Sequence, residues 1–475
     1  LFAPPTSASV RTRGHESAHL LAFRHGMAAE VPLPFELPSS EVVQRAKRNV
    51  GVCCALGVAF FALIFGAEGG GTLDPLGFVA YFYAVFSFCF QSCYLEWPAV
   101  TPEVCLWIAL AHGFLLGPSW LGSFGLWDGT PCRLLAWAVD VAFLIGTHRQ
   151  MIRGPIPAEL RAGSLTGKTC IVTGCNSGIG YSTAEVLAQA GATVVFACRT
   201  EGKAREAMRK VLSDAGGTIA EEQLMFLALD VSSFESVRRF AERFEETGLV
   251  LHRLILNAGV MLSSRSVSVD GLEMTMASNH FGHFLLVQLL LPTLLVAEKG
   301  GEQPRIVCVG SNMCYMHDAF DFSETVLCKG DDEKKAFLLK PYAMFRAYGQ
   351  SKLANVHFAT ELARRLQKKG SKIPVNVVHP GEVMTEVMRD MNKTVLWLYA
   401  IFRGPMNVLL KTPLQGAACT LHVATAPELA TSDSVSGGYF LRLSPAPLSK
   451  ACADATAAAR IWALSMELTG APPVV

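Results

Sequence analysis

Long apolar runs without any Asp, Glu, Lys or Arg dominate the first third of the chain. Three of them cover residues 50–67, 75–95 and 104–122. Each is long enough to cross a hydrocarbon core of about 30 Å as a helix. A fourth run, 132–147, is shorter and contains Asp140, whose charge would cost at least ~2.5 kcal/mol at the centre of a bilayer unless it is paired. The pattern predicts a helical membrane region of about four spans.

Basic residues flank this region on both sides. Arg45, Lys47 and Arg48 precede the first run, and Arg149 and Arg153 follow the last. Because loops rich in Lys and Arg stay on the cytosolic side of a membrane, both flanks are expected in the cytosol. This arrangement requires an even number of crossings and favours four spans over three. The alternative is that one or two runs cross the membrane and the others lie in its interface.

From Lys168 onward the pattern changes to short apolar runs that alternate with helical stretches. The runs predict strands at 169–173, 193–198, 224–229, 252–257, 305–309 and 374–379. The stretches between and after them predict helices near 179–190, 201–214, 233–247, 272–296, 344–369 and 451–469. Repeated alternation of strand and helix indicates an α/β domain with a parallel sheet that is covered on both faces.

The chain is therefore expected to contain four regions. Residues 1–48 form an N-terminal tail, 49–150 the transmembrane helical region, 151–164 a linker, and 165–475 the α/β domain. A mean hydropathy of +0.33 and a hydrophobic content of 51% agree with a membrane protein.

Charge and cysteine usage narrow the choice of partners and compartment. The net charge is +1, so no overall field favours nucleic acid, and no nucleic-acid-binding motif is present. The 14 cysteines are scattered, without C-x-x-C or any other metal-ligand spacing. They are interpreted as reduced thiols in apolar surroundings, so no metal is expected and the α/β domain is placed in a reducing compartment.

A glycine-rich turn lies between the first predicted strand and helix. Gly174, Gly178 and Gly180 have the spacing G-x-x-x-G-x-G. Glycine allows a tight turn and a close approach of backbone N–H groups to a pyrophosphate, and the helix N-terminus adds partial positive charge. This turn predicts a dinucleotide site.

Residues at the ends of the next strands indicate which dinucleotide binds. Arg199 follows the second strand, where an Asp or Glu would favour NAD, and its guanidinium can hold a 2′-phosphate. The prediction is NADP(H); the alternative is a solvent-exposed Arg that starts the next helix. Asp230 after the third strand can accept a bond from the adenine amino group, cap the following helix near Ser232 or Ser233, or do both.

A pair suited to proton transfer follows about 170 residues after the glycine turn. Tyr348 and Lys352 are four apart and share one face of a predicted helix. A nearby ammonium lowers the pKa of a tyrosine, which is near 10 in the free side chain. Ser311 can hold the substrate oxygen, and Asn279 can complete a proton relay. Tyr342 is the nearest rival, but Arg346 occupies its i+4 position.

Several stretches together resemble the short-chain dehydrogenase/reductase superfamily, in particular its retinol dehydrogenase-like branch. These stretches are TGCNSGIG at 173–180, ACR at 197–199, NAG at 257–259, NHFGHFLL at 279–286, VGS at 309–311, YGQSKLAN at 348–355, HPGEVMTE at 379–386, KTPLQGA at 411–417, SGGYF at 436–440 and AARIWALSMELTG at 458–470. The resemblance covers about two-thirds of the chain.

The resemblance implies a Rossmann-type doubly wound parallel sheet with a catalytic tetrad and an NADP(H) site. By motif position the tetrad is Asn279, Ser311, Tyr348 and Lys352. The cofactor would contact Gly174, Asn176, Ser177, Gly178, Ile179, Gly180, Arg199, Asp230, Val231, Asn257, Ala258, Gly259, Tyr348, Lys352, Pro380, Gly381 and Thr385. It also implies retinoid, steroid or other lipid substrates, and a homo-oligomer through the helix of Tyr348.

Two segments bear on the substrate. An insertion at 322–341 lengthens the interval between Ser311 and Tyr348, and it is interpreted as a solvated surface element. Residues 394–402 (TVLWLYAIF) follow the Pro380–Gly381 turn. They form either an apolar lid that receives a substrate from the bilayer or an ordinary core or dimer helix.

The sequence thus predicts a membrane-anchored NADP(H)-dependent oxidoreductase that acts on a hydrophobic alcohol and its aldehyde or ketone. Its catalytic domain would face the cytosol from the endoplasmic reticulum or another organelle membrane. Two alternatives remain open: a non-catalytic NADP(H)-binding scaffold or sensor, and a light-dependent reductase like that of protochlorophyllide. Transport by the membrane region has little support, because Asp140 is the only carboxylate within its four runs.

Overall fold

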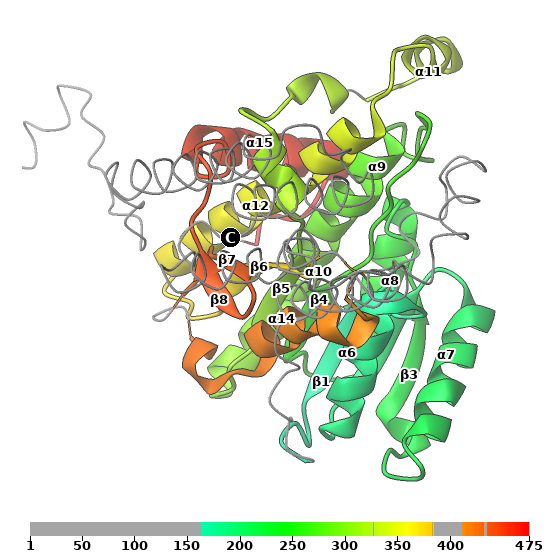
Figure 1. The fold of residues 1–475 in the computed structure, drawn as a ribbon, viewed down its shortest axis with the longest axis vertical. Helices are drawn as coiled ribbons and strands as arrows, with labels where there is room; N and C mark the ends of the chain where they lie inside the picture. The colour runs from blue at the N-terminus through cyan, green and yellow to red at the C-terminus, as the bar shows by residue number, and fades with distance from the viewer. Residues whose placement is uncertain (1–162, 326, 382, 384–410, 432–434, 475) are drawn as a thin grey trace, which may run out of the picture.

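The computed structural model describes residues 163–475, apart from 326, 382, 384–410, 432–434 and 475. The predicted N-terminal tail and membrane region, the linker up to residue 162, Thr385 and the apolar segment 394–402 lie outside the described residues. Within the described part, one eight-stranded sheet runs through the centre of the molecule (Figure 1). The predicted α/β fold is confirmed.

The strands follow the order β3-β2-β1-β4-β5-β6-β7-β8, and only the last pair is antiparallel. Their bounds are β1 Thr169–Thr173, β2 Thr193–Cys198, β3 Leu224–Ala228, β4 Arg253–Leu256, β5 Arg305–Val309, β6 Val375–His379, β7 Tyr439–Leu441 and β8 Ser444–Ala446. The first six agree with the predicted strands to within one residue at each end. The sequence analysis missed β7 and β8, which have three residues each.

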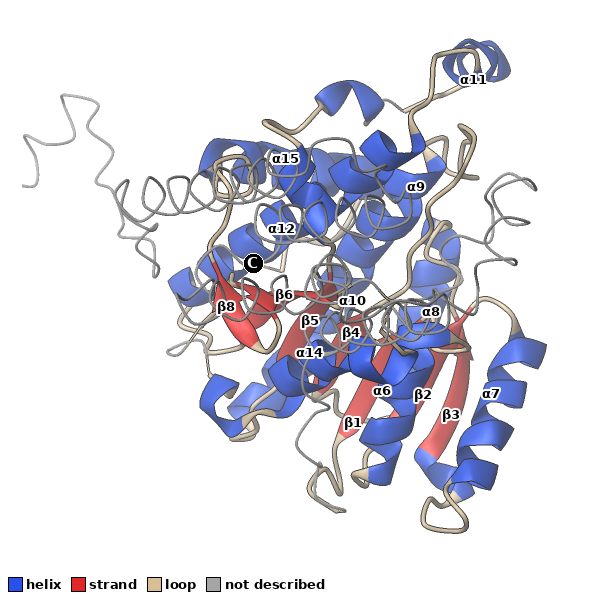
Figure 2. Cartoon of the chain, in the orientation of Figure 1, coloured by secondary structure: helices blue, strands red, loops and turns tan. Residues whose placement is uncertain are grey.

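Helices cover both faces of the sheet (Figure 2). Their bounds are α6 Gly178–Gln189, α7 Glu201–Asp214, α8 Phe234–Glu246, α9 Met274–Met276, α10 Gly282–Lys299, α11 Asp331–Leu338, α12 Met344–Lys368, α14 Pro413–Thr425 and α15 Ala455–Thr469. All six predicted helices are present, but the one expected at 272–296 is interrupted by a π-turn over Ala277–Phe281. Helices α11 and α14 were not predicted.

Two apolar cores hold the helices against the sheet. Helices α6, α7 and α14 pack on one face, where Val172, Phe196 and Leu187 are fully buried. Helices α8, α10, α12 and α15 pack on the other, where Phe284 and Trp462 form an edge-to-face pair 5.0 Å apart. Both faces of the parallel strands are therefore closed to water, which explains why these strands are continuous apolar runs.

Helix α10 and the segment before it, Met274–Lys299, are the one stretch of the described residues apolar and long enough to cross a membrane. In this fold 72% of its most apolar window is buried inside the protein. We therefore assign it to the domain core.

The order of the strands reverses at β1, with β2 on one side and β4 on the other. Ligands of such sheets bind at the carboxyl ends of the strands beside this point.

Two buried arginines lie at the opposite, amino-terminal ends of the strands. Arg253 and Arg305 face each other in the register of β4 and β5. The Nε of Arg253 donates to the carbonyl of Ala424 at 2.6 Å, and Arg305 donates to that of Val423 at 3.0 Å. They thus bind the last carbonyls of α14, where positive charge is favourable. These contacts fix α14 against the sheet.

All eight cysteines of the described residues are buried free thiols, as the sequence predicted. Burial raises the pKa of Cys308 to about 12, so this thiol stays protonated and apolar in character.

Candidate active site

The glycine turn joins β1 to α6 at the point where the strand order reverses. Gly174 and Gly178 have φ values of +66° and +60°, a region that favours glycine. A Cβ added at Gly180 would lie 2.4 Å from Asn257 Nδ2 and 2.7 Å from the carbonyl oxygen of Gly174. The turn is therefore folded too tightly against its own helix to accept a side chain at Gly180.

The first turn of α6 is open to an anion. Ser177 is its N-cap, but its side chain makes no capping hydrogen bond within the described residues, and the first turn contains no acidic residue. Free N–H groups and the positive end of a helix bind phosphate. The predicted residues Asn176, Ser177 and Ile179 lie on this turn, so its geometry fits a dinucleotide pyrophosphate.

The substitution Gly180→Ala is expected to weaken NADPH binding. Relief of the clash must move the backbone of the turn, and overpacking of this kind costs ~1–3 kcal/mol, or about 5- to 150-fold in affinity. Fluorescence titration of the full chain with NADPH measures the effect. Gly202→Ala is the matched control, because apart from its chain neighbours and the nearby backbone of α7 no described atom lies within 4 Å of a Cβ at Gly202, and its φ is not positive. Equal affinities in both variants would contradict the assignment of the turn.

Arg199 and Asp230 lie side by side at the ends of β2 and β3. Arg199 NH1 is 3.8 Å from Asp230 Oδ2, and the guanidinium side chain is 66% exposed. Asp230 Oδ1 accepts hydrogen bonds from the backbone N–H and the hydroxyl of Ser232, whereas the N-cap of α8 is Ser233. Asp230 therefore braces the turn before α8 and does not cap the helix, while the exposed guanidinium of Arg199 forms an ion pair with it.

Close backbone contacts at Gly282 and Gly174 show how tightly the site is packed. A Cβ at Gly282, the first residue of α10, would lie 1.8 Å from the carbonyl oxygen of Val231. Likewise, a Cβ at Gly174 would lie 3.0 Å from the Cα of Ala258. Small residues therefore let α10 approach the turn at Val231 after β3, and let the Asn257–Gly259 segment approach the dinucleotide turn.

Tyr348 and Lys352 lie one turn apart on α12, with Ser311 opposite them at the end of β5. The Nζ of Lys352 is 5.4 Å from the centre of the Tyr348 ring and donates to the carbonyl of Val309 at 2.8 Å. Burial raises the pKa of Tyr348 to about 12, while a hydrogen bond with Ser311 acts in the opposite direction. Burial also lowers the pKa of Lys352 to about 8. The structure brings these three residues together.

Asn279 lies in the π-turn, and its side chain is fully engaged. Its Oδ1 accepts from the N–H of Val260 at 2.8 Å, and its Nδ2 donates to the carbonyl of Val260 and to Ser351 Oγ, both at 2.9 Å. Ser351 in turn donates to the carbonyl of Tyr348 at 2.7 Å. Asn279 is thus near the pair on α12, but its amide holds the backbone and makes no hydrogen bond to either side chain within the described residues.

Pro380 and Gly381 follow β6 at the same edge of the sheet. Gly381 has a φ of +87°, and a Cβ there would lie 2.6 Å from Lys411 Nζ. Lys411 donates to the carbonyl of Pro380 at 3.3 Å. Thr385 lies outside the described residues, so its predicted cofactor contact stays a prediction.

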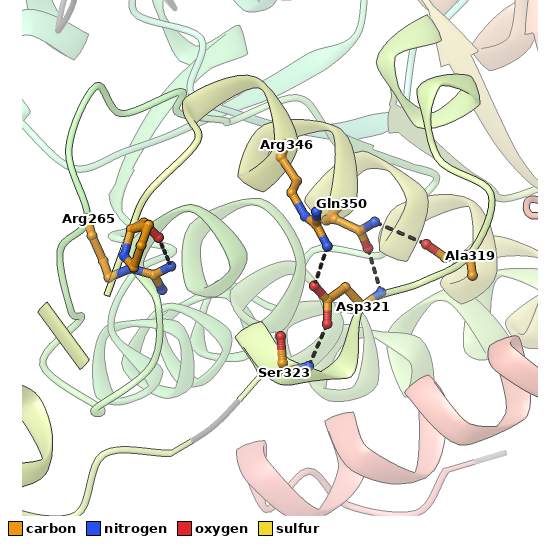
Figure 3. A network of polar contacts seen from close by, with 7 residues as sticks. Arg265, Ala319, Asp321, Ser323, Arg346 and Gln350 are labelled. Carbon is orange, nitrogen blue, oxygen red and sulfur yellow. Dashed lines mark hydrogen bonds and ion pairs between the residues drawn. The ribbon is translucent and has the colours of Figure 1, made fainter. Parts of the chain in front are cut away.

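Asp321, the residue directly before the insertion at 322–341, binds side chains at the start of α12 (Figure 3). Asp321 accepts from Arg346 at 2.8 Å and its N–H donates to Gln350 Oε1 at 2.8 Å. Beyond it, α11 projects away from the sheet (Figure 1) and buries only Phe337, which agrees with the predicted surface element. The guanidinium of Arg265 lies 4.4 Å from the centre of the Phe337 ring and fixes this end.

The sequence analysis missed residues that support the site through hydrogen bonds to its backbone and have no assigned catalytic role. Ser351 and Lys411 lie inside two of the family-like stretches, YGQSKLAN and KTPLQGA, and this position was the one sign of a role. Their partners Asn279 and Pro380 are distant in the sequence.

Comparison with known proteins agrees with this geometry. The family model described as short chain dehydrogenase matches residues 168–321 and 337–396. Human retinol dehydrogenase 11 is 38% identical over 310 residues, which are 65% of this chain and 87% of that protein. Mouse polyprenol dehydrogenase is 35% identical over 339 residues, 71% of this chain and 94% of that protein.

A solved structure also matches part of this chain. The 3-ketoacyl-(acyl-carrier-protein) reductase of Brucella melitensis, complexed with NADH, is 21% identical, with 58% of this chain and 97% of that chain covered and a TM-score of 0.43. The sequence relatives decide the family: this chain belongs to the short-chain dehydrogenase family of nicotinamide-dependent oxidoreductases.

Proposed function

We propose that this chain is a membrane-anchored, NADP(H)-dependent oxidoreductase that interconverts a hydrophobic alcohol with its aldehyde or ketone. The observation that supports the proposal is that Tyr348, Lys352 and Ser311 lie together at the carboxyl edge of the sheet whose β1–α6 turn has the glycine geometry of a dinucleotide site. The fit of the glycine turn and of the open start of α6 to a pyrophosphate supports the cofactor.

When bound, a nicotinamide would supply the hydride for reduction of the carbonyl carbon, or accept it in oxidation of the alcohol. The residues of the chain handle the proton and the orientation. In the reductive direction, Tyr348 gives its hydroxyl proton to the carbonyl oxygen, so that an aldehyde, a hydride and a proton yield an alcohol. Ser311 holds that oxygen in line with the tyrosine. Lys352 places positive charge near the ring, which stabilises the phenolate that forms.

Arg199 supports the preference for NADP(H) over NAD(H). Its exposed guanidinium at the end of β2 lies where an adenosine 2′-phosphate would be held, and no carboxylate replaces it at that position. We expect Arg199→Ala to raise the Kd for NADPH about 10- to 100-fold, since hydrogen bonds to charged groups contribute ~1.5–3 kcal/mol.

The same variant should bind NADH as the wild type does, because NADH lacks the phosphate. Parallel titrations with the two cofactors measure the difference. Equal losses for both cofactors would contradict the assigned role of Arg199.

The substrate class rests on the relatives and on the predicted membrane region. The two relatives are named for retinol and polyprenol, which are both apolar alcohols, and the apolar runs before residue 150 would place the domain at a bilayer. Catalysis on the cytosolic side follows from the basic flanks.

The test is turnover by the full chain in detergent, with NADPH and a panel of all-trans-retinal, a polyprenal, a steroid ketone and a small water-soluble aldehyde. The proposal predicts turnover of at least one apolar carbonyl. Turnover of the water-soluble aldehyde alone would contradict the substrate class. NADPH binding without any turnover would favour the scaffold alternative. In sealed microsomes, added protease should cleave the catalytic domain, and full protection would contradict its cytosolic placement.

A further inference from the structure

His283 connects the two halves of the candidate active site. It lies on α10, one helical turn after Asn279, and its side chain is buried, with 3% of the residue exposed. Its Nε2 is 3.0 Å from the hydroxyl oxygen of Thr173, the last residue of β1. Its Nδ1 is 3.2 Å from the backbone carbonyl of Asn279 in the π-turn. Both ring nitrogens are therefore occupied.

The hydrogen-bond partners fix the tautomer of the ring. Thr173 Oγ1 accepts from the N–H groups of Asn257 and Ala258, both at 2.9 Å. Both lone pairs of this hydroxyl are used as acceptors, so its own proton is donated to His283, and Nε2 is the acceptor. The proton of the neutral ring is then on Nδ1 and is donated to the carbonyl of Asn279. Burial lowers the pKa of His283 to about 4, and the charge of Lys352 acts in the same direction, which keeps the ring neutral near pH 7.

The contact with Asn279 occurs where the helix is irregular. The N–H of Gly282 donates to the carbonyl of Ala277, five residues earlier, instead of four. A π-turn interrupts the regular ladder of backbone hydrogen bonds and is frequent at functional sites. The imidazole of His283 thus supplies a side-chain donor to a carbonyl inside the irregular turn and holds that turn in place.

Hydrogen bonds continue from both ends of this contact. On one side, Asn257 Nδ2 donates to the carbonyls of Thr173 and Gly174, at 2.9 and 3.3 Å. On the other side, Asn279 Nδ2 donates to Ser351, which donates to the carbonyl of Tyr348. An unbroken chain of bonds therefore runs from the dinucleotide turn to the helix that carries the tyrosine.

We propose that His283 is a positioning residue, which holds the π-turn and the helix of Tyr348 and Lys352 in register with the dinucleotide turn. The inference rests on the proposed function, because register matters only if a proton and a hydride reach the same substrate. His283 makes no contact with the side chains of Tyr348, Ser311 or Lys352 through a hydrogen bond in the described structure. It acts through Thr173 and Asn279.

Three variants of His283 separate this role from general packing. His283→Phe keeps the ring but removes both hydrogen bonds. The amide of Asn places its NH₂ group near the position of Nδ1, so His283→Asn retains the donor to Asn279. The longer side chain of His283→Gln places its amide near Nε2 and retains only the contact with Thr173. Each is measured as the full chain in detergent for kcat with all-trans-retinal and NADPH, for the Kd of NADPH by fluorescence, and for the midpoint of thermal unfolding.

The matched control is His357→Phe. His357 is equally buried on α12, but neither of its ring nitrogens has a hydrogen-bond partner among the described residues. It should retain the wild-type kcat. We expect His283→Phe to lose about 10- to 100-fold in kcat, as small misplacements of catalytic groups do, with the Kd of NADPH changed less than about threefold. His283→Asn should recover most of the kcat, and His283→Gln should not.

Each outcome decides between the roles. If His283→Phe does not fold, the comparison of Asn with Gln remains, and an equal kcat in these two variants would overturn the inference. An unchanged kcat in His283→Phe would overturn it as well, as would a loss of kcat matched by an equal loss of NADPH affinity. If the wild type and His357→Phe bind NADPH but turn over none of the carbonyls in the panel, the proposed function fails, and the inference fails with it.

Discussion

Replacement of Tyr348 by Phe lowers kcat/KM for an apolar aldehyde by about 1,000-fold and leaves the Kd of NADPH unchanged. The substitution removes one hydroxyl, the only group of the ring that can carry a proton, and general acid–base catalysis contributes typically about 10²- to 10⁴-fold. The backbone of α12 is unaffected, because Ser351 binds the carbonyl of Tyr348 and not its side chain. Steady-state kinetics and NADPH titration of the same preparation measure both quantities.

Tyr342→Phe is the matched control. Tyr342 precedes α12, and its hydroxyl lies 3.0 Å from the hydroxyl of Thr275, at the start of α9. The Tyr342→Phe variant loses this hydrogen bond and a longer one to Glu273 Oε1 at 3.4 Å, so its unfolding midpoint falls by an amount that corresponds to roughly 1–2 kcal/mol, while kcat stays near the wild-type value. An active Tyr348→Phe variant, or an equally inactive Tyr342→Phe variant, would show that the proton comes from elsewhere.

Replacement of Lys352 by Met lowers kcat by about 100-fold or more and makes the cofactor-free fold more stable near pH 7. Activity falls because the positive charge 5.4 Å from the centre of the Tyr348 ring is lost. Stability rises because burial holds the pKa of Lys352 at about 8, below its ordinary value of 10.5. That difference corresponds to about 3 kcal/mol, which exceeds the ~1 kcal/mol lost when the carbonyl of Val309 loses its donor.

The pH dependence of this effect has a definite sign. Between pH 8 and 10.5 the unfolded chain binds a proton at Lys352 that the folded chain has released, so the stability of the wild type rises with pH in this window relative to Lys352→Met. The two unfolding midpoints should therefore approach each other, or cross, above pH 10. Lys352→Arg is a useful comparison, since it retains a charge that cannot be released and should be the least stable of the three. A Met variant that is less stable at pH 7 would contradict the cost assigned to the buried charge.

Much of the fold could be predicted because the strands of a buried parallel sheet consist of short apolar runs. The runs at β1, β2 and β5 have the predicted bounds. The π-turn at Ala277–Phe281 could not be predicted, because its residues also suit a regular helix. Strands β7 and β8 meet through Arg442 and Leu443, which have positive φ values without being glycine, so the usual signal of a tight hairpin is absent.

The candidate site was predicted to the extent that its chemistry is local in sequence. The glycine turn and the Tyr348–Lys352 pair have fixed short spacings, so their motifs are visible in the chain. The residues that support the site could not be predicted in this way. Thr173 and His283 are 110 residues apart, and nothing in the sequence around a threonine in a strand or a histidine in a helix indicates such a partner. The engaged side chain of Asn279 also shows that a motif position does not reveal which atom of a residue is used.

The central claim is that this site transfers a hydride between a nicotinamide and a carbonyl carbon. It is tested most directly by reduction of all-trans-retinal by the full chain, with NADPH that carries deuterium at both positions of the nicotinamide C4. We predict that the retinol product contains one deuterium on its carbinol carbon, and that Tyr348→Phe forms almost none of this product. Retinol without deuterium, or no retinol or other reduced product from the whole carbonyl panel while NADPH is bound, would contradict the claim.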